Sequence, residues 1–443
     1  MRSVLYGGAI ALNNTLLTLS LEADWTITAN KRANIAWNKL NLIINPTFKK
    51  MNLFTEYPEK DEAKYSDLMS ELVKKNMANL YGGEKKKTAK RDTHSKTNAA
   101  VQGTLEIFDF DEAAIKQELS KRTSLTEAQL QAISLKQGLF AKPKQYPVWL
   151  RFANGAFSVK SDYEGDTRSM AVKVIGVEGE RLPQSHELKT QDIIVHNTEF
   201  FFVRTIKDFH SFFVAVYRAG LFPVFKLLVL FWLKLHPYES TLLQTSFKRF
   251  PKSLLTERYW SASAFSLGLK SDFDPSQPGR VPVEYPAVIK YAFTPVSSQP
   301  PHQQLPLESR PESELQRAKA SGSEDNYYRD DIIQALAKPD AEYCWDFQIQ
   351  FQTSPEMSID DTTIVWNEKE SPFITVGRLT VKHQQVNSAK DNDFGENLSF
   401  SPGNGLAVHR PVGAINRLRS IVYPIVANDR HQKRGVKYQE PTV

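Results

Sequence analysis

Arg419-Ser420-Ile421-Val422-Tyr423, near the C-terminal end, is the most informative stretch of this sequence. Its i,i+4 spacing places the Arg419 guanidinium and the Tyr423 phenol on one face of a helix, within reach of each other. A free tyrosine ionises only near pH ~10, and a permanently charged guanidinium beside it favours the phenolate. The stretch therefore predicts an anionic oxygen that can hold ferric iron at neutral pH.

A second segment, Arg91-Asp92-Thr93-His94, lies at the other end of the chain, and Arg430 follows Tyr423 by seven residues. An RxxxY pair alone occurs by chance in any long chain. Three further segments lie between the two ends in a fixed order: 146–154 (YPVWLRFAN), 165–173 (GDTRSMAVK) and 197–204 (NTEFFFVR).

These five ordered segments resemble the haem catalase superfamily, and the resemblance runs from about residue 90 to residue 434. It implies an α+β fold, in which surrounding helices cover an eight-stranded antiparallel β-barrel. It also implies ferric haem b, with Tyr423 as the iron ligand and Arg419 supporting the phenolate. The chain ends just after Arg430, so we expect a small member that lacks the flavodoxin-like tail of the largest catalases.

Hydrophobic patterning favours the same architecture. Residues 59–80 read as a helix, 109–138 as two helices with a cap at 124–126, and 205–260 as helical and aromatic-rich. Amphipathic stretches lie at 311–321 and 324–338, and a last helix begins near Val412. Because few of the apolar strand-like segments are separated by helices, they favour an antiparallel barrel. The expected strands are 101–109, 146–154, 168–176, 191–196, 199–204, 286–294, 343–352 and 372–382.

The resemblance assigns a distal acid–base residue to His94, and an imidazole suits this role because it titrates near working pH. The superfamily pairs this histidine with an asparagine that hydrogen-bonds the peroxide, and Asn197 is the best match. A shift of one residue would exchange Asn197 with His196, so both stay open. Thr93 stands where ordinary catalases often have valine, and its hydroxyl could reorient a bound peroxide.

Haem carries two propionates, and burying them requires paired cations. The resemblance places Arg91, Arg151 and Arg430 at the propionates and stacks Phe209 on the porphyrin. One departure concerns Ala153, which stands where many catalases have a serine that orients the distal imidazole. His94 then needs another partner for its second ring nitrogen.

These features predict a haem-dependent hydroperoxidase that decomposes hydrogen peroxide, organic hydroperoxides or both. One alternative is an enzyme of the same fold that rearranges fatty-acid hydroperoxides, for example to allene oxides. Another is a barrel that binds haem or lipid without catalysis, which a distal base disfavours. The sequence does not decide the peroxide, NADPH binding or the number of subunits; a homodimer is one option.

Composition sets broader limits. With 41% apolar and 24% charged residues, the 443-residue chain can bury a sizeable core. Its single cysteine, Cys344, cannot form an internal disulfide, which favours a reducing compartment and a cytoplasmic location. The net charge of +6 and the basic run at 85–91 would tolerate an anionic partner. No recognition module is visible, so we expect no nucleic-acid partner.

Two segments stand apart. Residues 1–55 match nothing in the superfamily and read as an extension of unknown role, which leaves 56–443 as the catalase-like domain. Residues 221–235 are strongly apolar but short for a membrane span, and Lys226 and Lys234 interrupt them. We expect a packed helix there; the alternative is an interfacial patch that contacts a membrane or admits lipid.

Overall fold

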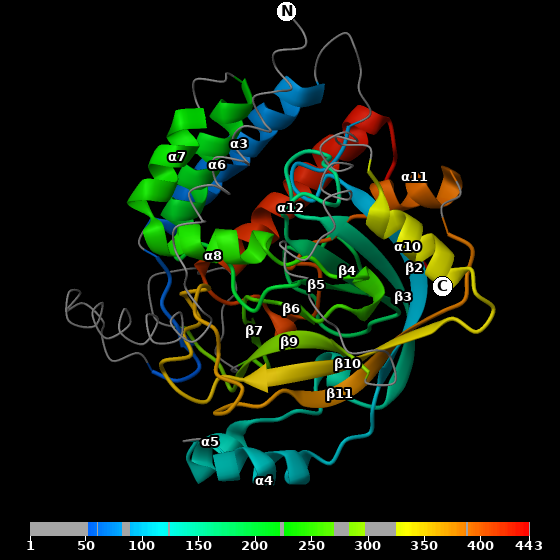
Figure 1. The fold of residues 1–443 in the computed structure, drawn as a ribbon. Helices are drawn as coiled ribbons and strands as arrows, with labels where there is room; N and C mark the ends of the chain where they lie inside the picture. The colour runs from blue at the N-terminus through cyan, green and yellow to red at the C-terminus, as the bar shows by residue number, and fades with distance from the viewer. Residues whose placement is uncertain are drawn as a thin grey trace, which may run out of the picture.

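A closed barrel of eight antiparallel strands forms the centre of the computed structural model (Figure 1). The ring runs β10-β11-β2-β3-β4-β5-β6-β9 and closes where β9 pairs with β10. Its strands are β2 (Thr97–Ile107), β3 (Lys144–Asn154), β4 (Arg168–Ile175), β5 (Thr190–His196), β6 (Tyr259–Trp260), β9 (Val288–Pro295), β10 (Glu342–Phe351) and β11 (Ile374–Lys382). The predicted fold class is therefore confirmed.

Short strands complete the sheet structure. β7 (Phe265–Ser266) pairs with β9, and β1 (Thr55–Glu56) forms a separate pair with β8 (Val283–Glu284). The structure describes residues 52–59, 61–81, 89–122, 125–221, 226–269, 283–296, 325–386 and 389–442. The predicted amphipathic stretch at 311–321 and most of the basic run at 85–91 lie outside these residues, as does nearly all of the predicted N-terminal extension.

Alternation along the strands separates the barrel core from an outer face. In β3, Val148, Leu150 and Phe152 are fully buried in the main hydrophobic core. The residues between them must point to the opposite face, because successive side chains of a strand alternate. This alternation gives β3, β4 and β5 a second face outside the barrel, on which other elements can pack.

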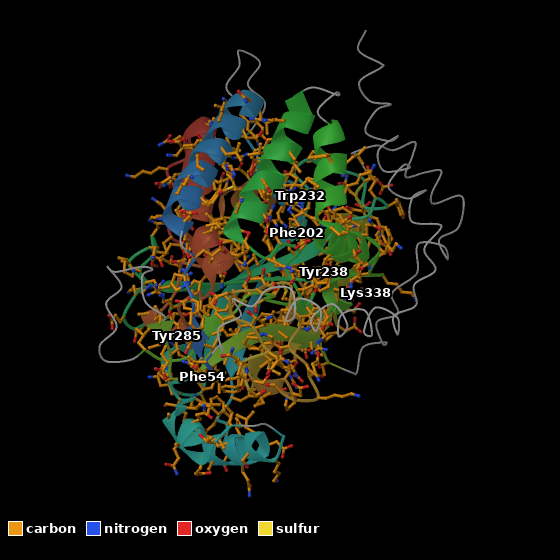
Figure 2. The ribbon with its side chains drawn as sticks, turned by 90° about the vertical axis from the view of Figure 1, so that its left-hand side faces the viewer. Phe54, Phe202, Trp232, Tyr238, Tyr285 and Lys338 are labelled. Atoms are coloured by element: carbon orange, nitrogen blue, oxygen red, sulfur yellow. The ribbon has the colours of Figure 1, made fainter. Side chains whose placement is uncertain are left out.

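Helices gather mainly on one side of the barrel (Figure 1). α3 (Glu62–Tyr81), α6 (Ile206–Leu221), α7 (Lys226–Leu235) and the long α12 (Ala414–Arg434) share a second hydrophobic core. Figure 2 shows Phe202 and Trp232 on this helical side, and Phe54 and Tyr285 toward the other end of the molecule. Elsewhere in the described residues lie α4 (Glu112–Arg122), α5 (Glu127–Ala132), α8 (Pro237–Phe247), α10 (Tyr327–Leu336) and α11 (Ala389–Asn397), with 3₁₀ turns at 138–140, 254–256 and 407–409.

Most predicted elements are present. The cap expected between the two helices of 109–138 is a capping box at Thr126, whose side chain accepts from Gln129 N. The strand predicted at 199–204 is wrong. After His196 the chain leaves the sheet, and Phe201 and Phe202 pack against the helical core instead. Tyr259–Trp260, in the region for which the sequence predicts helices, forms β6 and connects β5 to β9 in the barrel wall.

The first described residues are part of the body. Phe54 is buried in the main core, and its carbonyl accepts a hydrogen bond from Tyr285 N at 2.9 Å. Glu56 accepts from Gly413 N and lies beside Arg417 at the start of α12. Phe54 and Glu56 thus belong to the same packed body as the barrel and α12.

The apolar segment at 221–235 contains α7 (Lys226–Leu235). Trp232 and Leu233 are buried in the helical core, which agrees with the expected packed helix. Phe231 and Leu235 nevertheless remain 60% and 61% exposed. Among the described residues, no helix combines the length and the apolar character needed to cross a membrane.

Candidate functional site

The outer face of β3, β4 and β5 carries the candidate site. Arg151 of β3, Ser169 and Ala171 of β4, and Ile194 and His196 of β5 all alternate with barrel-core residues and so point outward. An apolar cluster forms there from Ala171, Ile194, Leu398 and Phe400, and Trp149, Phe394 and Tyr423 pack against it. α12 thereby places Tyr423 over the small outward side chains of the barrel wall.

Arg419 and Tyr423 lie together on α12, as their spacing predicts. The Arg419 Cζ atom is 5.4 Å from the centroid of the Tyr423 ring, and the Arg419 side chain is buried. Its Nη1 donates to Asn416 Oδ1 at 3.3 Å and to Ser263 Oγ at 3.4 Å, while its Nε has no partner. A fixed positive charge thus sits beside the phenol.

His94 has a strained backbone. Its φ is 54°, in the left-handed region that residues with a side chain rarely adopt. Its backbone N–H donates to Gly155 O at 3.2 Å, and its carbonyl accepts from Arg151 Nη2 at 2.8 Å. Such strain persists only where the surroundings impose it, and it concentrates at functional sites.

Ser169 is the second partner that His94 needs. The Ser169 Oγ lies 2.9 Å from His94 Nδ1 and donates its own proton to the Ala153 carbonyl at 3.2 Å. The hydroxyl oxygen must therefore accept a proton from Nδ1–H, which leaves Nε2 with its lone pair. Ser169 pairs directly opposite Ala153 in the β3–β4 register. The hydroxyl missing at Ala153 is thus supplied from the neighbouring strand.

Electrostatics keep the His94 imidazole neutral. Burial and the nearby charges of Arg151, Arg419 and Arg91 lower its pKa to about 3. The side chain is nevertheless only half-buried. Thr93, also half-buried, precedes it in the chain.

Arg91, Arg151 and Arg430 form a cationic cluster with one carboxylate, Glu396. The Arg91 Nη1 atom lies 3.4 Å from the Glu396 Oε2 atom. Burial raises the pKa of Glu396, but the guanidinium charges of Arg91 and Arg151 outweigh that effect and lower the pKa to about 2. Burial, together with mutual repulsion, lowers the pKa of Arg151 and Arg430 well below its usual value. The Nε of Arg430 has no hydrogen-bond partner. These four residues carry two positive charges in excess.

That excess tests whether haem suits the site. A haem presents two propionate carboxylates, which would neutralise two buried guanidinium charges and accept hydrogen bonds from unpartnered N–H groups. Its porphyrin is apolar, like the cluster around Ala171 and Ile194. Among the described residues no group of three or more His, Cys, Asp or Glu side chains could hold a metal ion. The residues present fit a haem.

The structure distinguishes between the two distal candidates, His196 and Asn197. His196 ends β5 on the outward face and pairs with Ser169 in the β4–β5 register. Asn197 is fully buried beyond the strand, and its Oδ1 accepts from Arg168 N at 2.8 Å. This arrangement favours His196 on the side of His94, although Asn197 Nδ2 is also without a partner.

Phe209 lies in the helical core, with its ring 5.6 Å from that of Phe201. Phe201 lies beside the candidate site. The centroid of its ring is 6.0 Å from that of the His196 ring and 5.7 Å from the Arg419 Cζ atom. Sequence reasoning missed Phe201 because it read that residue as part of a strand. Packing explains the position of Phe209, and stacking on a porphyrin stays a prediction.

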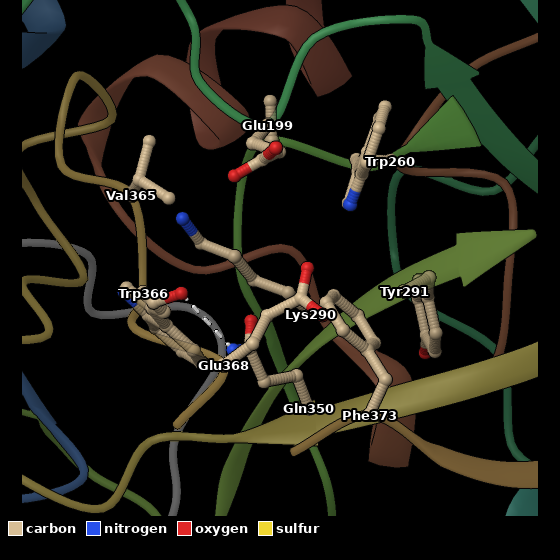
Figure 3. A pocket seen from close by; sticks show the side chains of 10 residues that line it. Glu199, Trp260, Lys290, Tyr291, Gln350, Val365, Trp366, Glu368 and Phe373 are labelled. Atoms are coloured by element: carbon tan, nitrogen blue, oxygen red, sulfur yellow. Dashed lines mark hydrogen bonds between the residues drawn. The ribbon is translucent and has the colours of Figure 1, made fainter. Parts of the chain in front are cut away.

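A separate pocket lies next to the seam between β5 and β6 (Figure 3). Its volume of about 10 Å³ holds roughly one water molecule, so it cannot be the site of a porphyrin. The buried Lys290 amine lies 4.7 Å from the centroid of the Trp366 ring, and burial lowers its pKa to about 7. The lining residues are Glu199, Trp260, Ala262, Lys290, Tyr291, Gln350, Val365, Trp366, Glu368 and Phe373.

Comparison with solved structures identifies the fold. A fungal catalase aligns with a TM-score of 0.53 at 17% identity, and the alignment covers 78% of this chain and 59% of that one. Catalase A from Saccharomyces cerevisiae aligns with a TM-score of 0.54 at 14% identity, covering 80% and 66%. The chain has the catalase fold. A bacterial catalase aligns with a TM-score of 0.50 at 17% identity, and the alignment covers 80% of this chain and 61% of that one.

The catalase fold is shared at low identity. No protein-family model and no curated protein matches the sequence. The chain spans between 59% and 66% of the length of these three catalases. The fold is thus established by the barrel and its helices, while the activity has to be argued from the site residues.

Proposed function

We propose that this protein is a haem-dependent hydroperoxidase, which decomposes hydrogen peroxide, organic hydroperoxides or both. The observation that carries the proposal is the excess of two positive charges in the cluster of Arg91, Arg151, Arg430 and Glu396, together with the Arg419–Tyr423 pair. A dianionic, apolar, iron-bearing group would satisfy all of these features at once.

Each residue would have a defined role. Tyr423 would hold the iron and Arg419 would favour its phenolate, while the three arginines would bind the propionates. Bound ferric haem would supply the redox centre at which the O–O bond is cleaved. The His94 lone pair at Nε2 would take the proton from the hydroperoxide and return it to the departing oxygen. Ser169 would keep that imidazole in the required tautomer.

An absorption spectrum of the purified protein, followed by oxygen measurement, tests this function. We expect near one-to-one haem and the spectrum of high-spin ferric iron with a phenolate ligand. Added hydrogen peroxide should release oxygen, and an added organic hydroperoxide should be reduced to its alcohol and water when a phenolic electron donor is supplied. A protein that does not take up haem during expression or reconstitution would refute the proposal.

Rearrangement of fatty-acid hydroperoxides is the second candidate. The exposed apolar side chains of α7 favour it, since a lipid substrate must be taken from an apolar phase. Product analysis separates the two reactions. Hydroperoxidase activity yields oxygen or an oxidised donor, whereas rearrangement yields an isomer or a dehydrated product of the fatty-acid hydroperoxide without oxygen release.

A further inference from the structure

His196 is a second buried imidazole on the same face as His94. It stands opposite Ser169 in the β4–β5 register, and Ser169 is the hydrogen-bond partner of His94. Its side chain is buried, and its Nε2 has no hydrogen-bond partner. A buried polar nitrogen without a partner is costly, so it indicates a ligand that is bound in the working protein.

The hydrogen bonds of Thr198 fix the tautomer of His196. The Thr198 Oγ1 donates to the Phe200 carbonyl at 3.0 Å and lies 2.9 Å from His196 Nδ1. Since its single proton goes to the carbonyl, the hydroxyl oxygen accepts from Nδ1–H. The His196 Nε2 is therefore unprotonated and can only accept a hydrogen bond. The two imidazoles thus have the same tautomer, each fixed by a hydroxyl that donates to a carbonyl.

We propose that His196 Nε2 is a second hydrogen-bond acceptor for the bound peroxide and that it selects substrates with two O–H groups. The inference rests on the proposed function. Hydrogen peroxide can donate one O–H to His94 and the other to His196. An organic hydroperoxide has a single O–H and leaves one lone pair without a donor. Asn197, the alternative distal residue, carries an amide that can donate, whereas this imidazole cannot.

If His196 Nε2 accepts a hydrogen bond from hydrogen peroxide, substitution of His196 should affect hydrogen peroxide more than an organic hydroperoxide. His196→Leu removes the acceptor and keeps an apolar side chain in the buried position. We expect kcat/KM for hydrogen peroxide to fall roughly five- to tenfold, as for one lost neutral hydrogen bond. The value for cumene hydroperoxide should change by less than about twofold, since that substrate can still donate its one O–H to His94. His196→Gln offers a carbonyl oxygen as acceptor and should restore most of the difference.

Two measurements test the inference. In haem-free protein labelled with ¹⁵N-histidine, ring-nitrogen NMR should find Nδ1 protonated and Nε2 unprotonated for His196, with the exposed His186 as the reference. In the haem-loaded protein, cumene hydroperoxide is assayed with an added phenolic reductant, which supplies the two electrons that its reduction to the alcohol and water consumes. The ratio of the two kcat/KM values should shift in His196→Leu and return in His196→Gln. His186→Leu is the matched control, and it should change neither value.

Three outcomes would overturn the inference. A protonated Nε2 would make His196 a donor. Equal losses on both peroxides would indicate a structural role only. A wild-type protein that binds haem but consumes neither peroxide would refute the proposed function and the substrate preference with it, while the NMR result alone would then decide whether Nε2 is an acceptor.

Discussion

The Ser169 hydroxyl lies 2.9 Å from the Nδ1 atom of His94, although the two residues are 75 positions apart in the sequence. The resemblance to catalases implies a serine hydroxyl at position 153, which is Ala153 here, directly across the strand pair from Ser169. The same hydrogen bond is therefore made from the other strand.

Ser169→Ala should slow peroxide consumption about tenfold without loss of haem, because the imidazole loses the partner that fixes its tautomer. The double variant Ser169→Ala/Ala153→Ser should recover part of the rate, since it returns a hydroxyl to the paired position. Stopped-flow peroxide consumption at matched haem content measures both variants. If the double variant is no faster than the single one, Ser169 does not act through His94.

His94→Ala should keep haem bound, because the proposed iron ligand is on α12. It should slow peroxide consumption by roughly two to four orders of magnitude, the usual contribution of a general acid–base group. Haem content from absorbance and initial rates from peroxide consumption give the two readouts. Loss of haem would instead make His94 a ligand, and an unchanged rate would remove it from the mechanism.

Tyr423→Phe should lose the phenolate signature from the absorption spectrum and most of the bound haem. Arg419→Leu removes the neighbouring charge and should weaken the same signature with less haem loss, because the oxygen ligand stays in place. Haem quantification and the ferric spectrum distinguish the variants. An unchanged spectrum in Tyr423→Phe would show that the iron ligand lies elsewhere.

Buried neutral histidines should make the haem-free protein sensitive to acid. Burial lowers the pKa of His409 to about 4, and its Nε2 accepts from Leu139 N at 2.9 Å. In the unfolded state the same imidazole binds a proton near pH ~6.5, whereas in the folded state it stays neutral down to about pH 4. The unfolded state therefore binds more protons between these values, and the free energy of unfolding should fall as pH drops from about 6.5 to 4. Chemical denaturation across this range measures the slope. His409→Gln should reduce it, and an unchanged slope would exclude His409 as a contributor.

The exposed side chains of Phe231 and Leu235 on α7 predict contact with an anionic lipid surface. Between Asp208 and Glu239 the sequence contains Arg218, Lys226 and Lys234 but no acidic residue. Glu239 is itself in an ion pair with Arg204, and the Asp208 Oδ1 atom lies 3.5 Å from the His236 Nε2 atom. A positively charged, apolar segment favours anionic phospholipid over a second copy of itself.

Vesicle co-sedimentation tests that contact. Binding to phosphatidylglycerol-containing vesicles should exceed binding to phosphatidylcholine alone, and Phe231→Ser/Leu235→Ser should reduce it. Leu188→Ser is the control, because Leu188 is 75% exposed on another part of the molecule. Equal vesicle binding by the double variant and the wild-type protein would rule out Phe231 and Leu235 as the lipid-binding surface. Oligomerisation that the double variant abolishes would show instead that this surface contacts a second copy of the chain.

The barrel could be predicted where burial enforces a pattern. In the middle of β3 and β4 one face is apolar, with Tyr146, Val148, Leu150 and Phe152 in β3 and Met170, Val172 and Val174 in β4, so the alternation is readable in the sequence. Phe200–Phe202 misled the prediction because aromatic residues fill helical cores as well as strands. The two residues of β6 are too few to show any period.

The site was predictable in part. The Arg419–Tyr423 pair follows from local helical spacing, which the sequence contains directly. Ser169 did not follow, because its position opposite Ala153 depends on strand register, and register is set by the whole barrel. The choice between His196 and Asn197 as the distal residue depends on which of them points to the outer face of β5. The sequence does not give the end of that strand to within one residue, so it does not decide between them.

Beside the site, two neighbouring strands of the barrel are joined by very little pairing. β5 pairs with β6 only at His196–Trp260. Few inter-strand hydrogen bonds mean that this seam can open locally at a lower cost than the rest of the barrel. Local opening would move the His196 imidazole together with the wall of the barrel. Opening of this seam would therefore also change the position of the His196 imidazole relative to His94.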